Sequence, residues 1–219
     1  MAQRTDRPRY WAANLAVMIV FAAGGIAIGF YNLWRQDSRA WMGWISPLYL
    51  LLPFLLRKVF RLRPAYLMDI TLFLFIFLAF DLGVALSWYA KLAYYDLAMH
   101  LLAGMVFDII GLCWFYRLRE DRQKPMGADK GVALFFALCF TQLIAVVWEI
   151  FEFVSDKITG DDAQNVLATG VVDTMEDLII CLAGALIITL PLYLHLKSGK
   201  KSIVFAPLDQ FYQVNFGRQ

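Results

Sequence analysis

The stretch VVWEIFEFVSD, residues 146–156, places two glutamates at the end of a long apolar run. Glu149 and Glu152 stand three residues apart, so they share one face of a helix. A glutamate is almost never buried without a partner, because its charge loses the solvation that water provides. The two carboxylates also lie near the C-terminal end of their helix, where the helix dipole disfavours negative charge. They therefore need compensation from a cation, a proton or a histidinium.

Two further pairs of chemically capable residues have helical spacing. Asp96 precedes His100 by four residues, and Asp173 stands four residues before Asp177. Carboxylates with an imidazole suit a hard or borderline divalent ion such as Mg²⁺, Mn²⁺, Fe²⁺ or Zn²⁺. We therefore expect a divalent-metal site whose ligands come from the three pairs: Asp96, His100, Glu149, Glu152, Asp173 and Asp177. The residues expected to act in catalysis are Glu149, His100 and Asp177.

Two of these pairs also have an interpretation that needs no ligand. Asp96 fits a helix N-cap, and the run DTME at 173–176 resembles a capping box in which Glu176 reaches back. His100 taken alone fits a hydrogen-bonded interior histidine. The glutamate pair has no such interpretation, because it stands at the wrong end of its helix for an acid.

The elements that must position these residues are long apolar segments. The chain has 219 residues, 61% of them hydrophobic, and its mean hydropathy is +0.59. A helix needs about 20 apolar residues to cross a bilayer. Six segments qualify, at about 12–34, 41–56, 66–88, 97–118, 131–154 and 171–195. The sequence therefore predicts an all-α polytopic membrane bundle of six transmembrane helices, forming one domain over 1–219 with a polar C-terminal tail at 196–219.

Basic residues gather in alternate loops, and in membrane proteins such loops face the cytoplasm. The residues on the side with many charges are Arg4, Arg7 and Arg9; Arg57, Lys58, Arg61 and Arg63; Arg117, Arg119, Arg122, Lys124 and Lys130; and Lys197, Lys200 and Lys201. The loops on the other side carry only Arg35, Arg39, Lys91 and Lys157. We therefore expect both termini on the cytoplasmic side of a bacterial plasma (inner) membrane.

In this orientation all three pairs fall in the outer part of the bilayer. At about 1.5 Å per residue, His100, Glu149 and Asp177 lie about 6–10 Å below the outer helix ends, and Asp81 shares their depth. Asp108 lies about two turns below His100 and is a candidate for a proton or ion path, because intramembrane acids are functional by default.

The small residues Gly104 and Gly184 have a different expected role. Both stand inside predicted membrane helices that also carry members of the three pairs. Because glycine has no side chain to hold two backbones apart, we expect these positions to permit close helix packing.

Three motifs resemble the YjdF-like family of bacterial integral membrane proteins: YYDLAMHLLAGM at 94–105, WEIFEF at 148–153 and VVDTMEDLIICLAGAL at 171–186. That family carries a tyrosine-aspartate and histidine motif, a tryptophan-glutamate motif, and an aspartate-threonine-x-x-aspartate motif before a glycine-containing helix. A looser similarity runs to the VanZ-like family, which spaces an aspartate, a histidine, a glutamate and a further aspartate in the same order. The resemblance covers about 90–190 and implies a shared acidic site.

Three functions are open from the sequence. The first is metal-dependent chemistry, in which an ion polarises a phosphate or activates water on a lipid or lipid-linked substrate in the outer leaflet. The second is transport of a cation or proton by the same acids, and the third is a structural network of acids that fixes helix packing. Membrane lipid is the expected partner. Nucleic acid is not expected, because topology explains the basic loops, and the sequence decides neither enzymatic activity nor oligomeric state.

Overall fold

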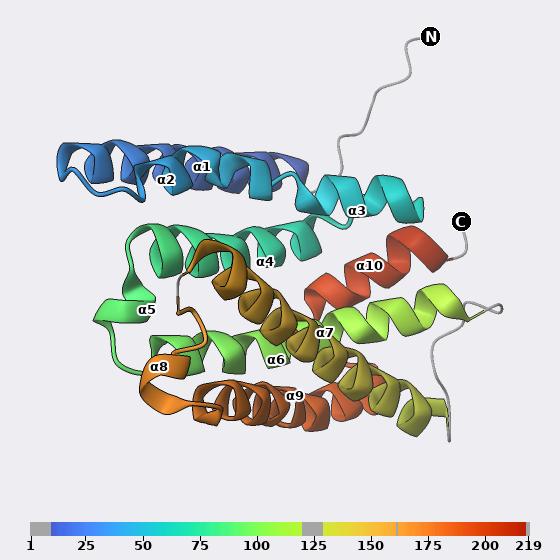
Figure 1. Ribbon diagram of the computed structural model, residues 1–219. Coiled ribbons are helices and arrows are strands. Elements are labelled where there is room, and N and C mark those ends of the chain that lie inside the picture. The colour runs from blue at the N-terminus through green and yellow to red at the C-terminus, as the bar shows by residue number, and fades with distance from the viewer. Residues whose placement is uncertain (1–9, 120–128, 161, 218–219) are drawn as a thin grey trace, which may run out of the picture. The chain divides into compact units, whose positions relative to one another are not determined.

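The computed structural model describes residues 10–119, 129–160 and 162–217, and these residues form helices and connecting segments without a strand (Figure 1). Six stretches within them are long and apolar enough to cross a membrane: Trp11–Trp34, Ala40–Phe60, Tyr66–Ala85, Tyr95–Leu118, Asp129–Thr159 and Val172–Ser198. The predicted all-α bundle with six membrane helices is therefore confirmed. The orientation of the termini stays a prediction. Five basic residues that favour it lie outside the described residues: Arg4, Arg7, Arg9, Arg122 and Lys124.

The helices group into two compact units, one of Met1–Leu92 with Asp209–Gln219 and one of Ala93–Leu208. The first unit contains α1 (Trp11–Trp34), α2 (Ala40–Tyr49), α3 (Leu52–Phe60), α4 (Tyr66–Ile76), the π-helix η1 (Phe77–Ala85), α5 (Trp88–Lys91) and most of α10 (Ala206–Phe216). The second contains α6 (Tyr95–Leu118), α7 (Asp129–Thr159), α8 (Val166–Thr169) and α9 (Val172–Ser198). The expectation of one domain over 1–219 stays a prediction.

Two predicted segments of the first unit consist of two helices each. The segment expected at 41–56 is divided between α2 and α3, and Pro53 stands in the first turn of α3. Proline fits there because its missing N–H needs no partner at a helix start. The segment expected at 66–88 begins as the α-helix α4 and continues as η1, in which Leu86 N–H bonds Asp81 O at 3.0 Å, five residues back. A π-helix is rare and often marks a functional position.

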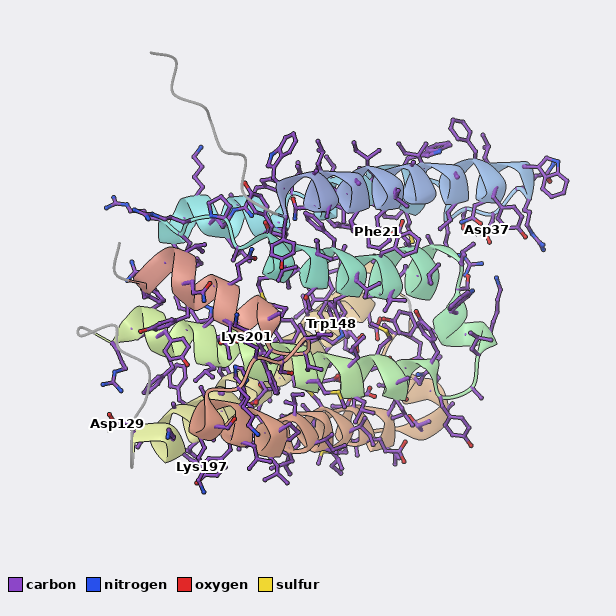
Figure 2. All side chains as sticks on the ribbon, turned by 180° about the vertical axis from the view of Figure 1, so that it is seen from behind. Phe21, Asp37, Asp129, Trp148, Lys197 and Lys201 are labelled. Atoms are coloured by element: carbon purple, nitrogen blue, oxygen red, sulfur yellow. The ribbon has the colours of Figure 1, made fainter. Side chains whose placement is uncertain are left out.

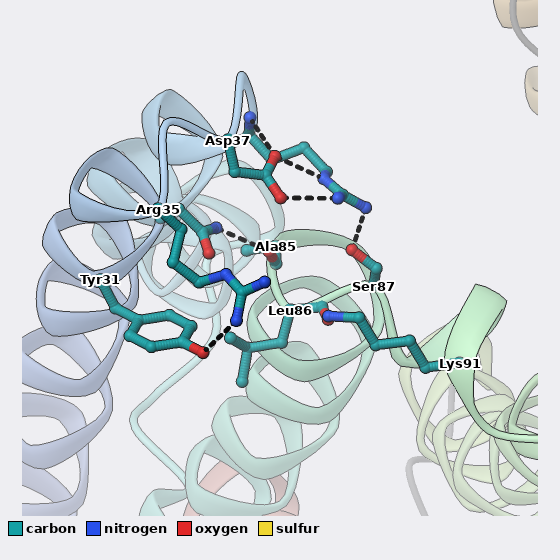
Figure 3. A network of polar contacts seen from close by, with 9 residues as sticks. Tyr31, Arg35, Asp37, Ala85, Leu86, Ser87 and Lys91 are labelled. Atoms are coloured by element: carbon teal, nitrogen blue, oxygen red, sulfur yellow. Dashed lines mark hydrogen bonds and ion pairs between the residues drawn. The ribbon is translucent and has the colours of Figure 1, made fainter.

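The turn between α1 and α2, for which the outer side of the membrane stays a prediction, is tied down by polar side chains (Figure 3). Asn32 Nδ2 donates to Ala85 O at 2.7 Å, which joins the end of α1 to the end of η1. Arg39 Nη2 pairs with Asp37 Oδ2 at 2.6 Å, and Arg39 also contacts the Ser87 hydroxyl. These bonds fix the α1–α2 connection against the last turn of η1.

The C-terminal tail contains a helix that the sequence analysis does not predict. Within the first unit, Gln210 Oε1 accepts Leu67 N–H at 2.8 Å, and Asn215 Oδ1 accepts Arg63 N–H at 2.7 Å. Leu67 N–H is one of the first N–H groups of α4, which a helix leaves without partners. Arg63 lies in the segment just before α4. Part of α10 therefore bonds to the first turn of α4 and to the segment that leads into it.

In the second unit, α6, α7 and α9 all contact one another, and α7 crosses the other two obliquely (Figure 1). Asp129 at the start of α7 and Lys197 near the end of α9 lie at the same end of this unit (Figure 2). Arg119 Nη1 pairs there with Asp129 Oδ2 at 3.1 Å. Since α6 and α9 both end here, their starts, with Asp96 and Asp173, lie at the opposite end. The second unit thus separates basic and acidic ends as the sequence pattern predicts.

Candidate metal site

Close packing of α6 against α9 positions the candidate site. A Cβ added to Gly104 would collide with the carbonyl oxygen of Cys181, and one added to Gly184 would collide with that of Leu101. Because the obstacles are backbone atoms, they cannot move aside as a flexible side chain would. The role expected for these glycines is therefore confirmed. His100 stands one turn before Gly104, and Asp177 stands about two turns before Gly184. The glycine contact therefore holds the two helix segments that carry these side chains close together.

Three of the predicted ligands converge at this point. His100 Nε2 lies 3.5 Å from Asp96 Oδ1 and 3.7 Å from Asp177 Oδ2. Each residue offers one ligand atom, and these atoms all lie within 4.8 Å of one another. Ligands bound about 2.1 Å from one ion stand about 3–4 Å apart, so a small inward movement would let one ion bridge the three. Asp177 and His100 are buried, whereas the side chain of Asp96 is 31% exposed.

Side-chain capping does not account for the acids at the starts of α6 and α9. The N-cap positions are Tyr94 and Val171, and neither makes a side-chain capping hydrogen bond. Asp173 is the second residue of α9 and not its N-cap, so the run DTME does not form a capping box with Glu176. Asp96 and Asp173 are thus available for interactions beyond their own helix ends.

Glu149 is buried beside a residue that the sequence analysis does not single out. Gln164 Nε2 lies 3.4 Å from Glu149 Oε2, 3.1 Å from Glu149 O and 3.2 Å from Thr174 Oγ1. The other carboxylate oxygen, Glu149 Oε1, is buried and has no hydrogen-bond partner. Gln164 lies in the connection between α7 and α8, and no spacing rule relates that connection to a helix face. No sequence signal could have found it.

The remaining two predicted ligands bond to neighbours instead. Trp148 Nε1 donates to Glu152 Oε1 at 2.9 Å, and Asn165 Nδ2 donates to Asp173 Oδ2 at 3.0 Å. Both acids are partly exposed. They still interact electrostatically with His100 and Asp96. The structure therefore brings three of the six predicted ligands to ligand distance of one another and surrounds them with the other three acids.

Charge around His100 is unbalanced. Its imidazole interacts electrostatically with Asp177, Asp96 and Glu149. One imidazolium offsets at most one of these carboxylates if all three are ionised. Like charges held close together in a poorly solvated region repel strongly. The cluster therefore favours binding of a further cation or of protons.

Asp108 lies deeper in α6 and is fully buried. Its Oδ2 is 3.4 Å from Thr189 Oγ1, but that hydroxyl makes a shorter bond to Ala185 O at 2.7 Å. Asp108 Oδ1 has no hydrogen-bond partner. Its proposed part in an ion or proton path stays a prediction.

The fold and the cluster together describe a multi-pass membrane protein with an Asp–His–Asp group between two of its helices. Residues 11–198 match the family described as "Predicted membrane protein (DUF2238)". This match spans most of the chain, so the protein belongs to that family, and the resemblance to the YjdF-like family is confirmed. The similarity to the VanZ-like family stays a prediction.

One curated relative is an uncharacterized protein of Thermotoga maritima, 31% identical over 110 residues. The aligned residues make up 50% of this chain and 53% of the relative, so the match spans about half the length of each. No solved structure matches the chain. The comparisons thus establish the family and leave its chemistry to be argued from the site.

Proposed function

We propose that Asp96, His100 and Asp177 bind a divalent metal ion in the outer half of a bacterial inner membrane, and that this centre acts on a lipid or lipid-linked substrate. The observation that carries the proposal is the convergence of three ligand atoms within 4.8 Å of one another. They come from two helices whose separation is fixed by Gly104 and Gly184. A fixed separation of the two backbones keeps the ligand atoms close to one another. Metal binding requires such defined distances between ligands.

The ligand set narrows the choice of ion. Two carboxylates and one imidazole suit Mn²⁺, Fe²⁺ or Zn²⁺ better than Mg²⁺, which prefers oxygen ligands and retained water. Three protein ligands leave coordination positions for water or substrate, as in catalytic metal sites. Such an ion supplies Lewis-acid chemistry when bound. Glu149 Oε1, which is buried and without a partner, is the group best placed to accept a proton beside it.

The surroundings of the cluster support a lipid substrate. The Asp96 side chain is 31% exposed and that of Asp177 3%, so the group is accessible from the start of α6. Large apolar residues near the same helix ends, including Phe151 and Val171, are exposed. In a membrane such side chains contact acyl chains. A head group would then reach the cluster from the outer leaflet.

Metal content tests the first half of the proposal. Purified full-length protein in detergent should retain about one divalent ion per chain by elemental analysis, and Asp177→Asn and His100→Ala should lose it. Glu176→Gln is the matched control, because Glu176 is exposed in the same turn of α9. Wild-type protein that neither retains nor takes up a divalent ion would leave the acids as a structural network.

Lipid chemistry tests the second half. Metal-loaded protein incubated with bacterial lipid extract should change a head group detectable by mass spectrometry. Glu176→Gln should retain this activity, whereas Glu149→Gln should lose it while still binding metal if Glu149 acts as the proton acceptor. An unchanged lipid profile with a fully loaded centre would reject the lipid substrate.

Cation or proton transport is a second candidate, favoured by one observation. Asp108 continues the polar groups of α6 about two turns below His100, and its Oδ1 has no partner. Transport predicts an ion or proton flux in liposomes that Asp108→Asn abolishes. Chemistry confined to the outer leaflet predicts no flux.

Both proposals depend on orientation, which reporter fusions can measure. Fusions after Lys200 and after Arg122 should report the cytoplasm, and a fusion near Asp161 should report the outer side. Arg122 and Asp161 lie outside the described residues, but the reporters read only the side of the membrane. A cytoplasmic signal at Asp161 would place the cluster at the inner face.

A further inference from the structure

The first unit contains a buried acid that the proposed metal site does not use. Asp81 in η1 and Ser46 in α2 are each 2% exposed. The Ser46 hydroxyl interacts with the Asp81 carboxylate, but neither Asp81 Oδ1 nor Ser46 Oγ makes a hydrogen bond of good geometry. Burying a polar group without a partner is costly, and burying a carboxylate without compensation costs more. These two oxygens therefore need a ligand or a reason to be left unsatisfied.

Both oxygens face the same point on α1. A Cβ added to Gly25 would collide with Ser46 Oγ and also with Asp81 Oδ1. The two side chains thus come from different elements and meet at a glycine of a third. Gly43 provides a second close approach, because a Cβ there would lie 2.7 Å from the Gly25 carbonyl oxygen. Glycines at both positions let α2 and the side chains of Ser46 and Asp81 pack directly against the backbone of α1.

The π-helix is the second structural sign of a site. Asp81 is its central residue, and the bond from Leu86 N–H to Asp81 O at 3.0 Å spans the wide turn. A π-turn inserts one residue relative to an α-helix and changes the face on which the following side chains lie. Such turns are uncommon and are frequent at functional positions. Here the wide turn lies where the carboxylate meets α1 and α2.

No cation of the described first unit neutralises Asp81. The charged groups on the helices packed around η1 have other partners: Asp69 in α4 pairs with Arg57, and Lys91 in α5 donates to Leu86 O at 2.6 Å. The other titratable groups on these helices are the phenols of Tyr31, Tyr49, Tyr66 and Tyr89. Of these, Tyr49 interacts electrostatically with Asp81, but a neutral phenol supplies no positive charge.

We propose that Asp81 and Ser46 bind a monovalent cation of the size of Na⁺ between α1, α2 and η1. A carboxylate and a hydroxyl are the hard oxygen ligands that alkali cations prefer. One carboxylate balances one positive charge, whereas a divalent ion would leave a net charge buried among apolar helices. The site is separate from the Asp96–His100–Asp177 group in its residues, its unit and the charge of its ion.

Thermal unfolding of the full-length protein in detergent tests the site with Na⁺ as the probe. NaCl replaces choline chloride at constant ionic strength, so that only the specific cation changes. Binding to the folded state should raise the wild-type Tm by about 3 °C or more at saturating Na⁺. Asp81→Asn should abolish this rise, and Ser46→Ala should shift its midpoint to higher Na⁺ concentration.

Two controls make each outcome decisive. Asp37→Asn removes an acid of the same unit that pairs with Arg39, and it should keep the Na⁺ response. Asp177→Asn should also keep it, so failure of the divalent-metal proposal is distinguishable from failure of this one. Should Asp81→Asn not fold, the Ser46→Ala midpoint decides.

Equal wild-type melting in Na⁺ and choline, with no bound ²²Na⁺, would overturn the proposal. Asp81 would then be a buried carboxylic acid without an ion. A Na⁺ response that Ser46→Ala leaves unchanged would overturn it equally, because the bound ion would lie elsewhere.

Discussion

Two sites with buried acids, one in each unit, balance their charge in different ways. In the first unit Asp69 has its own partner, Arg57. In the second unit Asp96 and Asp177 share one histidine, and Glu149 adds a third negative charge to the same imidazole. An acid with a dedicated cation is balanced without any ligand. A group with more acids than cations is balanced only when something else binds.

The same comparison separates two roles for intramembrane charge. A one-to-one pair such as Arg57–Asp69 joins α3 to α4. Its role is structural and needs no bound ligand. The Asp96–His100–Asp177 group joins α6 to α9 at a place where Gly104 and Gly184 already provide the contact. Its charges are therefore not needed to hold the helices together. That difference leads to opposite expectations for neutralising substitutions at the two sites.

Breaking the dedicated pair should have the largest effect. The Asp69 side chain is 4% exposed, so Arg57→Ala would leave a buried carboxylate without its cation. We expect a loss of about 3–5 kcal/mol, measured as a lowered Tm in detergent. Lys58→Ala is the matched control, because Lys58 is exposed in the same turn of α3. The double variant Arg57→Ala with Asp69→Asn should recover part of the lost stability. If Arg57→Ala leaves the Tm unchanged, this ion pair does not stabilise the fold.

Separating the helices of the second unit should have the next largest effect. Gly184→Ala places a Cβ against the Leu101 carbonyl, so α6 and α9 must move apart at a cost of about 1–3 kcal/mol. The distance from His100 to Asp177 should grow, and retained metal should fall with it. Gly131→Ala is the control: nothing lies within 4 Å of the added Cβ, and alanine should stabilise the helix by about 0.5–1 kcal/mol. Unchanged metal content in Gly184→Ala would show that this contact does not position the ligands.

Chelation should distinguish a metal site from a structural network. At metal concentrations of about 100 Kd, binding stabilises the folded state by about 2.7 kcal/mol. A chelator should therefore lower the Tm of the wild type and of Glu149→Gln, which keeps the three ligands, but leave Asp177→Asn and His100→Ala unchanged. Glu176→Gln should follow the wild type. If chelation has no effect and the amide variants are more stable, relief of carboxylate repulsion explains the result and a protonated network replaces the metal.

The sequence predicted the second unit better than the first. Helical spacing placed Asp96 with His100 and Asp173 with Asp177, and the close approach at Gly104 followed from residue size alone. Spacing gives a face and not a distance, so it could not show that Asp173 bonds to Asn165 while Asp177 reaches His100. Gln164 was missed because its place depends on the folded α7–α8 connection.

In the first unit, the departures from the predicted helices arise from tertiary structure. The π-turn at Asp81 has no composition signal, because its residues are as apolar as those of α4. The tail helix α10 is short and amphipathic, with Leu208 and Phe211 buried, so it lacks the length of a membrane segment. An isolated helix of that size is marginal in water and depends on contacts such as Gln210 with Leu67.

The smallest effect is expected at Asp37, which has a dedicated cation as Asp69 does but lies in an accessible loop. Hydrogen bonds from the Arg39 side chain and backbone lower the pKa of Asp37 from 3.8 to about 2. Because the folded-state pKa is depressed, the pair stabilises the fold fully above about pH 4 and loses this contribution as the pH falls toward 2. Screening by water limits the gain to under about 1 kcal/mol. The Tm difference between wild type and Asp37→Asn should therefore be small at pH 5 and vanish near pH 2. A difference that persists at pH 2 would assign the effect of Asp37 to its loop geometry and not to its charge.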